Sequence, residues 1–345
     1  MNRDMTSRRL PAEWEPQDGV LLAWPHDESD WAPYLDRVEP VFATIVAAIS
    51  QFERVLLVGP DPDRIWSRLL PTNAKVSRIT IDKLATNDTW SRDFGPLTIE
   101  EFGELVLLDF GFNGWGLKFA ANLDNQVNRH LSDRGRLKPR RHPVGLILEG
   151  GSIESDGAGT ILTTSECLLN ANRNPHLSKS EIELELRHRF GADHFLWLEH
   201  GYLAGDDTDS HIDTLARLCP DDTICYVRCD DPEDEHFPAL RAMEAELQAF
   251  RTRDGKPFRL LPLPWPKAAH GDEGERLPAT YANFLVINGA VLVPTYADPA
   301  DDSALATVAA AYPGREIIGI DCRPLILQHG SLHCVTMQLP KGVLP

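Results

Sequence analysis

The sequence alternates short apolar runs with longer amphipathic segments, and this alternation constrains the fold more than any other feature. The runs are rich in Val, Ile and Leu and are bounded by Gly, Pro, Asn or Asp, which is typical of β-strands. The longer segments carry apolar residues three or four positions apart, which predicts helices. We expect strands at 19–25, 54–60, 104–112, 145–151, 159–164, 194–201, 223–229, 283–296, 316–322 and 331–338, and helices at 39–52, 179–191, 238–251 and 301–314.

Two turn signals join neighbouring runs into hairpins. "DGAG" (156–159) and "NG" (288–289) each lie between two apolar runs, as tight hairpin turns do. Hairpins combined with helical crossovers predict an α/β protein with mixed sheets. No Gly/Ser-rich or Pro-rich linker divides the chain, so we expect residues 1–345 to form one domain. The rhythm fits about five strand–hairpin–helix units of roughly 60–70 residues, although no repeated motif marks them.

Composition and charge exclude several classes of partner. No apolar run reaches the roughly 18 residues that a membrane span needs, and no apolar h-region follows the basic N-terminus. The formal net charge is −18, and basic residues cluster only in "RGRLKPRRH" (134–142), so nucleic acid is not an expected partner. An acidic protein attracts cations through the field of its clefts. Solubility alone would also explain this charge, so it points to a small cationic ligand only together with the chemistry of a site.

The cysteines indicate a reducing compartment. None of them is spaced as C-x-x-C, and a chain of this length can build a core without disulfides. We expect reduced thiols in a cytoplasmic protein. The cysteines are Cys167, Cys219, Cys225, Cys229, Cys322 and Cys334.

The sequence lacks the usual signatures of several enzyme classes. The chain contains no G-x-G-x-x-G after a strand, no G-x-x-x-x-G-K-[ST], no H-E-x-x-H and no G-x-S-x-G. These absences argue against nucleotide-binding, zinc-protease and serine-hydrolase functions.

Polar residues gather beside apolar runs in two stretches of the first half of the chain. In "NDTWSRDFGP" (87–96), Asp93 follows Trp90 closely and precedes a Gly-Pro turn, although a capped surface turn would also explain them. In "LEGGSIESDG" (148–157), Glu149 ends a run. The two glycines after it let a ligand or another backbone approach closely, or they form a simple bulge.

A third stretch, "LAGDDTDSHIDTLARL" (203–218), concentrates carboxylates. They repel one another unless something positive lies among them or the loop is fully solvated. His211 and Asp213 are two positions apart and would share one face of an extended segment. Such a pair suits a general acid/base histidine beside a binding carboxylate.

The fourth candidate is Cys334, which follows His333 in "SLHCVTMQ" (331–338). A cysteine within an apolar run is more often a packing residue than a nucleophile. A catalytic role therefore depends on the other polar stretches coming to the same place.

Guanidinium chemistry uses a thiol, a histidine and several carboxylates without a metal. The ion is planar, and carboxylates bind its N–H groups in pairs. Resonance makes its carbon a poor electrophile, so hydrolysis needs a thiolate and a histidine that protonates the departing ammonia and then activates water. Asp93, Asp213, His211 and Cys334 supply this set.

The motifs, taken in order, resemble those of the agmatine deiminase family, which is related to bacterial peptidylarginine deiminases within the guanidine-modifying superfamily. The resemblance extends from Glu13 to Gln338. It implies a five-bladed α/β propeller that hydrolyses agmatine to N-carbamoylputrescine and ammonia without a cofactor or metal, and family habit suggests a homodimer. The matching stretches are "NDTWSRDFGP", "LEGGSI", "ECLLNANRNPH", "GDDTDSHIDTLARL", "YANFLVINGAVLVPTY" and "SLHCVT".

The resemblance also implies roles for the catalytic residues. Cys334 would be the nucleophile that forms an amidino-cysteine intermediate, and His211 the general acid/base. Asp93 and Asp213 would hold the guanidinium, and Glu149 would orient His211 or the substrate.

Further residues would contact the substrate. Trp90 would line the pocket beside the alkyl chain, and Trp115 lies in "FNGWG" (112–116), which resembles a mobile lid. Asp207 would add a binding carboxylate. Arg173 is a candidate, together with Arg92, for binding the carboxylate that free arginine carries and agmatine lacks.

The chain departs from the family pattern beside the nucleophile. Family members usually show "GGGNIHC", whereas this chain has "QHGSLHC", so that His329 and Ser331 replace Gly and Asn around Gly330. The change affects the choice between agmatine, free arginine and peptidyl arginine more than the deiminase chemistry.

Other functions remain open from the sequence. "DSHID" (209–213) has the D-x-H-x-D spacing of manganese ureohydrolases, which release urea, but neither 230–236 nor 297–303 supplies the second aspartate run that they need. An amidinotransferase would pass the amidino group to an amine. A non-enzymatic ribosome-binding factor of the same propeller shape would leave Cys334 and His211 without a role.

Overall fold

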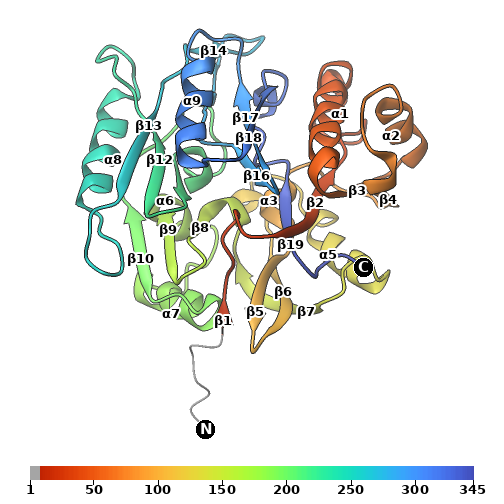
Figure 1. Ribbon diagram of the computed structural model, residues 1–345, viewed down its shortest axis with the longest axis horizontal. Coiled ribbons are helices and arrows are strands. Elements are labelled where there is room, and N and C mark those ends of the chain that lie inside the picture. Colours follow the sequence, from red (N-terminus) through yellow and green to blue (C-terminus); the bar gives the residue numbers. More distant parts are fainter. Residues whose placement is uncertain (1–7) are drawn as a thin grey trace.

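The computed structural model describes residues 8–345 (Figure 1). Within this part of the chain the strands form six small sheets, and helices pack between and around them. Two sheets have four strands: one contains β1 (Arg8–Arg9), β5 (Leu97–Glu101), β6 (Glu104–Gly111) and β7 (Arg140–Ile147), and the other contains β19 (Met337–Pro340), β2 (Gln17–Ala23), β3 (Arg54–Gly59) and β4 (Ile79–Lys83). Three sheets have three strands: β8 (Ile153–Ser155), β9 (Thr160–Thr164) and β10 (His194–Leu198) form one, β11 (Ala216–Cys219), β12 (Thr223–Val227) and β13 (Arg259–Leu263) form the next, and β16 (Leu285–Ile287), β17 (Ala290–Thr295) and β18 (Glu316–Asp321) form the third. The remaining sheet pairs β14 (Ala269–His270) with β15 (Arg276–Leu277).

Every sheet of three or four strands combines antiparallel with parallel pairing. An antiparallel hairpin such as β8–β9 or β16–β17 is followed by a strand that pairs in parallel, here β10 or β18. Parallel neighbours need a crossover, and a helix supplies it. The expected mixed α/β architecture with hairpins and helical crossovers is therefore confirmed.

The four long helices lie where the apolar spacing predicts them. Helix α7 shows why, because a capping box of Ser178 and Glu181 starts it, and Gly191 ends it in the left-handed conformation with φ 68°. The helices are α1 (Leu35–Phe52), α7 (Lys179–Phe190), α8 (Phe237–Ala249) and α9 (Asp301–Ala311), with the shorter α2 (Pro62–Leu69), α3 (Ser91–Phe94), α4 (Gly114–Leu117), α5 (Val127–Asp133) and α6 (Ser165–Leu168).

Two local expectations near the polar stretches are wrong. The strand predicted at 331–338 begins only at Met337, because the amides of His333 and Cys334 bind the side chain of Asn283 instead of a neighbouring strand. His211 and Asp213 do not lie on an extended segment either. Asp213 is in the one-turn 3₁₀ helix Ile212–Thr214, which starts directly after His211.

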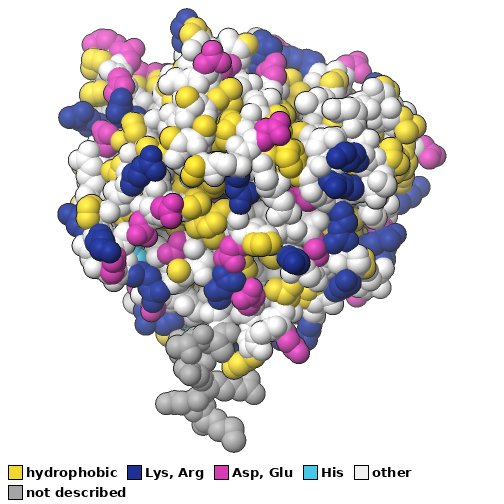
Figure 2. Space-filling model, viewed as in Figure 1, with side chains coloured by type: hydrophobic (Ala, Val, Ile, Leu, Met, Phe, Trp, Pro, Cys, Tyr) yellow, Lys and Arg dark blue, Asp and Glu magenta, His cyan; other side chains and the backbone are white. Residues whose placement is uncertain are grey.

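Helix α3 lies toward the middle of the view in Figure 1, whereas α1, α7 and α8 lie toward the periphery. On the face drawn in Figure 2, Lys and Arg side chains are interspersed with Asp and Glu. In residues 8–345, every helix is too short or too polar to span a bilayer.

Asp124 binds the backbone of the segment that precedes α3. Its Oδ1 atom accepts hydrogen bonds from the backbone N–H of Asn87 at 2.7 Å and of Asp88 at 3.3 Å. Burial raises the pKa of Asp124 to about 7, so the folded protein carries an ionised carboxylate above that pH at a cost in stability.

We expect Asp124→Asn to stabilise the protein. The amide keeps an acceptor for both N–H groups and removes the buried charge. In the unfolded chain the carboxyl ionises near its ordinary pKa, so the gain should grow as pH rises and reach about 1–3 kcal/mol near pH 8. Urea unfolding across this pH range measures the difference, and a variant less stable than the wild type near pH 8 would contradict the expectation.

Candidate functional site

Cys334 lies in the turn before β19, and the side-chain carbonyl of Asn283 holds this turn in place. Oδ1 of Asn283 accepts the backbone N–H of His333 at 2.8 Å and that of Cys334 at 3.3 Å. The Cys334 thiol lies 3.4 Å from the same oxygen and 3.9 Å from Oδ2 of Asp213. Asn283 therefore fixes both the backbone and the sulfur of the candidate nucleophile.

Asp93 is held by donors on both carboxylate oxygens. Its Oδ1 accepts the N–H of Gly151 at 3.0 Å, and its Oδ2 accepts Nε1–H of Trp115 at 2.9 Å. The Nδ1 atom of His211 lies 3.6 Å from Oδ1. Helix α3 is a single turn, so these contacts from two other segments determine where the carboxylate points.

His211 and Asp213 leave polar atoms without partners. Both side chains are buried, yet neither ring nitrogen of His211 nor Oδ1 of Asp213 has a hydrogen-bond partner among the described residues. An unpaired buried polar atom costs about 1–3 kcal/mol, so such atoms in a native protein call for an explanation. A ligand with N–H donors would satisfy the free carboxylate oxygen.

The buried charges change the acidities of the site. Burial raises the pKa of Asp93 to about 6, and the nearby Asp213 adds to this effect. Burial and the carboxylates of Asp213 and Asp93 raise the pKa of the Cys334 thiol well above its usual range. Burial alone would also raise the pKa of Asp213, but the hydrogen bond and charge of His333 hold it below its ordinary value. Without a cation among them, these groups favour a neutral thiol over a thiolate.

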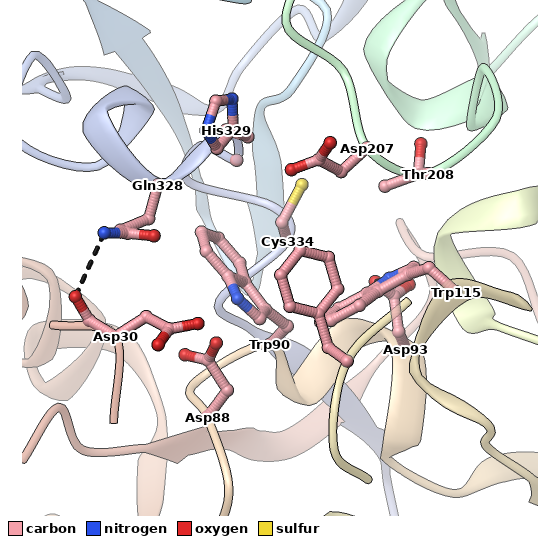
Figure 3. Close-up of a pocket in the computed structure, with 12 residues that line it drawn as sticks. Asp30, Asp88, Trp90, Asp93, Trp115, Asp207, Thr208, Gln328, His329 and Cys334 are labelled. Carbon is pink, nitrogen blue, oxygen red and sulfur yellow. Dashed lines mark hydrogen bonds between the residues drawn. The ribbon is translucent and has the colours of Figure 1, made fainter. Parts of the chain in front are cut away.

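A pocket opens over Cys334 and is lined by acids and aromatic rings. In Figure 3 Asp30 and Asp88 point toward each other on one side of Trp90, and Asp207 lies on the other side, near the sulfur of Cys334. No Lys or Arg of residues 8–345 lines it. The lining residues are Asp30, Asp88, Trp90, Asp93, Trp115, Phe119, Asp207, Thr208, Gln328, His329, Gly330 and Cys334.

The structure places most of the predicted residues around this pocket. Cys334, Asp93, Trp90, Trp115 and Asp207 line it directly. Asp213 and His211 lie behind this lining. Oδ2 of Asp213 is 3.9 Å from the thiol of Cys334, and Nδ1 of His211 is 3.6 Å from Oδ1 of Asp93.

Two predicted residues have a different environment. Both carboxylate oxygens of Glu149 accept Nε–H of Arg173 at 3.0 Å. Arg173 also donates to Asp209 at 2.6 Å and to the carbonyl of Thr208 at 2.9 Å, and its side chain is 1% exposed. Arg173 is therefore not available to bind a substrate carboxylate, contrary to its expected role. The same holds for Arg92, which is buried beside Glu13.

The residues around Gly330 differ in their relation to the pocket. His329 lines it, in the left-handed conformation with φ 66°, and its Nδ1 lies 2.7 Å from the carbonyl oxygen of Gly205. Ser331 is buried against the hydroxyl of Tyr296 at 3.0 Å. A Cβ atom on Gly330 would lie 2.2 Å from the Trp90 ring, so this position requires glycine.

Sequence reasoning missed Asn283 and Asp30. Asn283 is fully buried at the start of the apolar run 283–296. A polar amide at the start of such an apolar run is the sequence signal that could have found it, because a buried amide needs hydrogen-bond partners. Asp30 has no such signal, because only the folded chain brings it beside Asp88.

Two buried groups have ligand atoms within 4.8 Å of one another, as a metal site would. An arginine already pairs with the carboxylates of each group: Arg173 binds Glu149, and Arg217 binds Glu13 and Glu154. Asp209 and Asp213 of the D-x-H-x-D stretch belong to neither group. The groups are Glu149, Cys167 and His211, and Glu13, Glu154 and His333.

Comparison with known proteins agrees with the geometry. Residues 9–340 match the model of the Porphyromonas-type peptidyl-arginine deiminase family. An agmatine deiminase of Pseudomonas syringae pv. tomato is 35% identical, over 96% of this chain and 95% of its own.

Solved structures agree as well. The C. jejuni agmatine deiminase with bound substrate is 42% identical with a TM-score of 0.91, covering 97% of each chain. A Porphyromonas gingivalis protein described as a candidate arginine deiminase is 50% identical with a TM-score of 0.93, covering 98% of this chain and 100% of its own. A dimethylarginine dimethylaminohydrolase, 11% identical with a TM-score of 0.52, shares the fold.

Fold, site and relatives together define a hydrolase that acts on guanidino or amidino groups. The chain belongs to the Porphyromonas-type peptidyl-arginine deiminase family, whose model covers it almost completely.

The raised pKa of Cys334 leads to a testable expectation. In the free protein the thiol should stay protonated near neutral pH and ionise only above the range of an ordinary cysteine. The difference in ultraviolet thiolate absorbance between the wild type and Cys334→Ser isolates this group, because the other cysteines cancel. A step at or below pH of about 8 would show that the pocket stabilises a thiolate on its own.

Proposed function

We propose that this protein hydrolyses agmatine to N-carbamoylputrescine and ammonia through an amidino-cysteine intermediate. The observation that carries the proposal is a pocket in which the Cys334 thiol faces carboxylates, with no Lys or Arg of residues 8–345 in the lining. A dication fits such a pocket because each positive charge meets acidic side chains as it leaves water. The agmatine deiminases among the relatives support the same substrate.

Asp93 and Asp213 hold the guanidinium. Oδ1 of Asp213 is buried and free to accept an N–H. Oδ1 of Asp93 lies 3.6 Å from Nδ1 of His211, and Gly151 and Trp115 fix its two oxygens. A cation held between these carboxylates offsets the charges that raise the pKa of Cys334, so substrate binding itself favours the thiolate.

The thiolate then attacks the guanidinium carbon, and an S–C bond forms. His211 gives a proton to the nitrogen that leaves as ammonia when its C–N bond breaks. His211 next takes a proton from water, which attacks the same carbon. The C–S bond breaks, Cys334 leaves as thiolate, and the hydroxyl group loses its proton to solvent, where ammonia takes it up, as N-carbamoylputrescine forms. His211 then gives up the proton that it took from water, which restores the neutral thiol of the free protein.

The far end of the pocket selects against a substrate carboxylate. Free arginine would need a cation near Asp30 and Asp88, and both candidate arginines are engaged elsewhere. The ammonium of agmatine instead meets carboxylates, while Trp90 and Trp115 line the alkyl chain.

Glu149 acts on the site through Arg173. This arginine ties Glu149 to the loop that carries Thr208 and Asp209, just ahead of His211. Lys118 binds Asp209 at 2.9 Å. We propose that the neighbouring 112–116 segment opens as a lid.

The sheet order supports the propeller architecture. The five sheets of three or four strands, each with an antiparallel and a parallel strand pair, are the blades of a five-bladed α/β propeller. We assign the enzyme to the cytoplasm as a homodimer with the chain acting as one domain.

A substrate screen tests the function. Ammonia release from agmatine, free arginine and a peptide with C-terminal arginine should favour agmatine in kcat/KM by at least about 10-fold. EDTA should not reduce the rate, and no urea should form. Preference for arginine or its peptide would reassign the substrate, and EDTA-sensitive urea release would identify a ureohydrolase.

The same assay tests the nucleophile. Cys334→Ala should abolish ammonia release, by at least about 1000-fold, while the protein remains folded. The thiol is buried at a turn and makes no structural ion pair, so near-native thermal unfolding is the control. Turnover at the wild-type rate would exclude the covalent mechanism.

Gly151 offers a steric test of the assembled site. A Cβ atom there would lie 2.7 Å from Nδ1 of His211, 2.9 Å from Oδ1 of Asp93 and 3.2 Å from Oδ2 of Asp213. Gly151→Ala should therefore displace all of them and lower kcat/KM by at least about 100-fold. Gly145→Ala is the matched control, because no atom lies within 4 Å of its added Cβ. Equal activity of the two variants would mean that the reaction does not use this cluster.

A further inference from the structure

His333 lies directly behind the proposed guanidinium-binding carboxylate. Its Nδ1 is 2.7 Å from Oδ2 of Asp213, and its Nε2 is 2.7 Å from Oε2 of Glu13. All these side chains are buried. A neutral imidazole has one N–H and could donate to only one of the two carboxylates.

The carboxylates around His333 favour a positive charge there. Arg217 binds Glu13 at 2.8 Å and Glu154 at 2.6 Å, and Arg92 lies 3.8 Å from Glu13. Within residues 8–345, these two guanidiniums and His333 pair with Glu13, Arg217 also pairs with Glu154, and Asp213 pairs with His333, with His211 nearby. Buried ions are stable only when they are paired, so an imidazolium completes the balance.

We propose that His333 is a positioning residue, an imidazolium that bridges Glu13 and Asp213 and that fixes Asp213 as a carboxylate with Oδ1 turned to the substrate. The proposal rests on the proposed function for what Asp213 binds, but the charge of His333 is a property of the free protein.

This arrangement assigns different tasks to the two oxygens of Asp213. Oδ2 is occupied by His333, and Oδ1 has no partner among the described residues. The carboxylate can rotate little without losing the charged hydrogen bond, so the free oxygen is held ready for an N–H donor. The depressed pKa of Asp213, in contrast to the raised pKa of Asp93, agrees with a cation behind it.

The groups that face His333 define what a pH experiment can report. They are Asp213 and Glu13 at its nitrogens, Arg217 at 3.1 Å from Nε2, Arg92 and Glu154 beyond Glu13, and the adjacent Cys334.

Ring nitrogen chemical shifts test the charge directly. We expect ¹⁵N-histidine spectra of the free wild-type protein near pH 8 to show one residue with both nitrogens of the protonated type, lost in His333→Asn. Neutral-type shifts for the assigned residue would overturn the proposal. The measurement needs no turnover, so its result is independent of whether agmatine is the substrate.

Matched variants test the positioning role. His333→Asn keeps a donor near Asp213 without the charge, His333→Gln reaches only Glu13, and His333→Leu removes both contacts. We expect kcat/KM for agmatine to fall about 10-fold in the Asn variant and at least about 100-fold in the other two.

The pH profile separates positioning from loss of stability. Without the imidazolium, burial should raise the pKa of Asp213 as it raises that of Asp93. The carboxylate then protonates at higher pH, so the acid limb of kcat/KM should move upward and steepen from one proton toward two. His194→Asn, at a half-buried histidine bonded to Thr160 away from the site, is the control and should keep the wild-type profile.

Two outcomes would overturn the positioning role. One is a uniform loss of activity with an unchanged profile in His333→Asn. The other is equal activity of the Asn and Leu variants. If the wild type itself does not release ammonia from agmatine, the proposed function fails, and the nitrogen shifts still decide the charge of His333.

Discussion

The burial of carboxylates around a thiol, without a basic side chain of residues 8–345 lining the same pocket, is the constraint on which the site depends. Such a group of acids is unfavourable in isolation, and it raises the pKa of both Asp93 and Cys334. In the proposed function, a bound guanidinium would relieve the repulsion and at the same time activate the sulfur. Recognition and nucleophile activation would then follow from one electrostatic arrangement.

The buried polar groups on the two sides of Cys334 differ in whether they have hydrogen-bond partners. Behind the nucleophile, Glu13, Glu154, Arg217 and His333 pair with one another at hydrogen-bonding distance. In front of it, the free oxygen of Asp213 and the ring of His211 have no partner among the described residues. The rear layer contributes rigidity, so the front layer can remain incomplete until a ligand binds.

The sequence predicted the four long helices and most central strands because caps, glycines and apolar periodicity are local signals. Strands β4, β5, β8, β11 and β13 were missed, because charged residues or proline interrupt their short apolar patterns, and so were the two-residue strands β1, β14 and β15. Motif spacing identified Cys334, His211, Asp93 and Asp213, but Arg173 could not be assigned from the chain alone. Its partners Glu149 and Asp209 come from two other segments, and only folding decides that it faces them and not the pocket.

The contact between Gly330 and the ring of Trp90 limits how this family member can diversify. No side chain fits at residue 330 while the indole keeps its place, so mutation there is closed as a route to a new substrate. His329 and Gln328 border the same pocket without that restriction. Substitutions that alter the preference for a guanidine substrate are therefore expected at Gln328 and His329, whereas Gly330 and Trp90 can change only together.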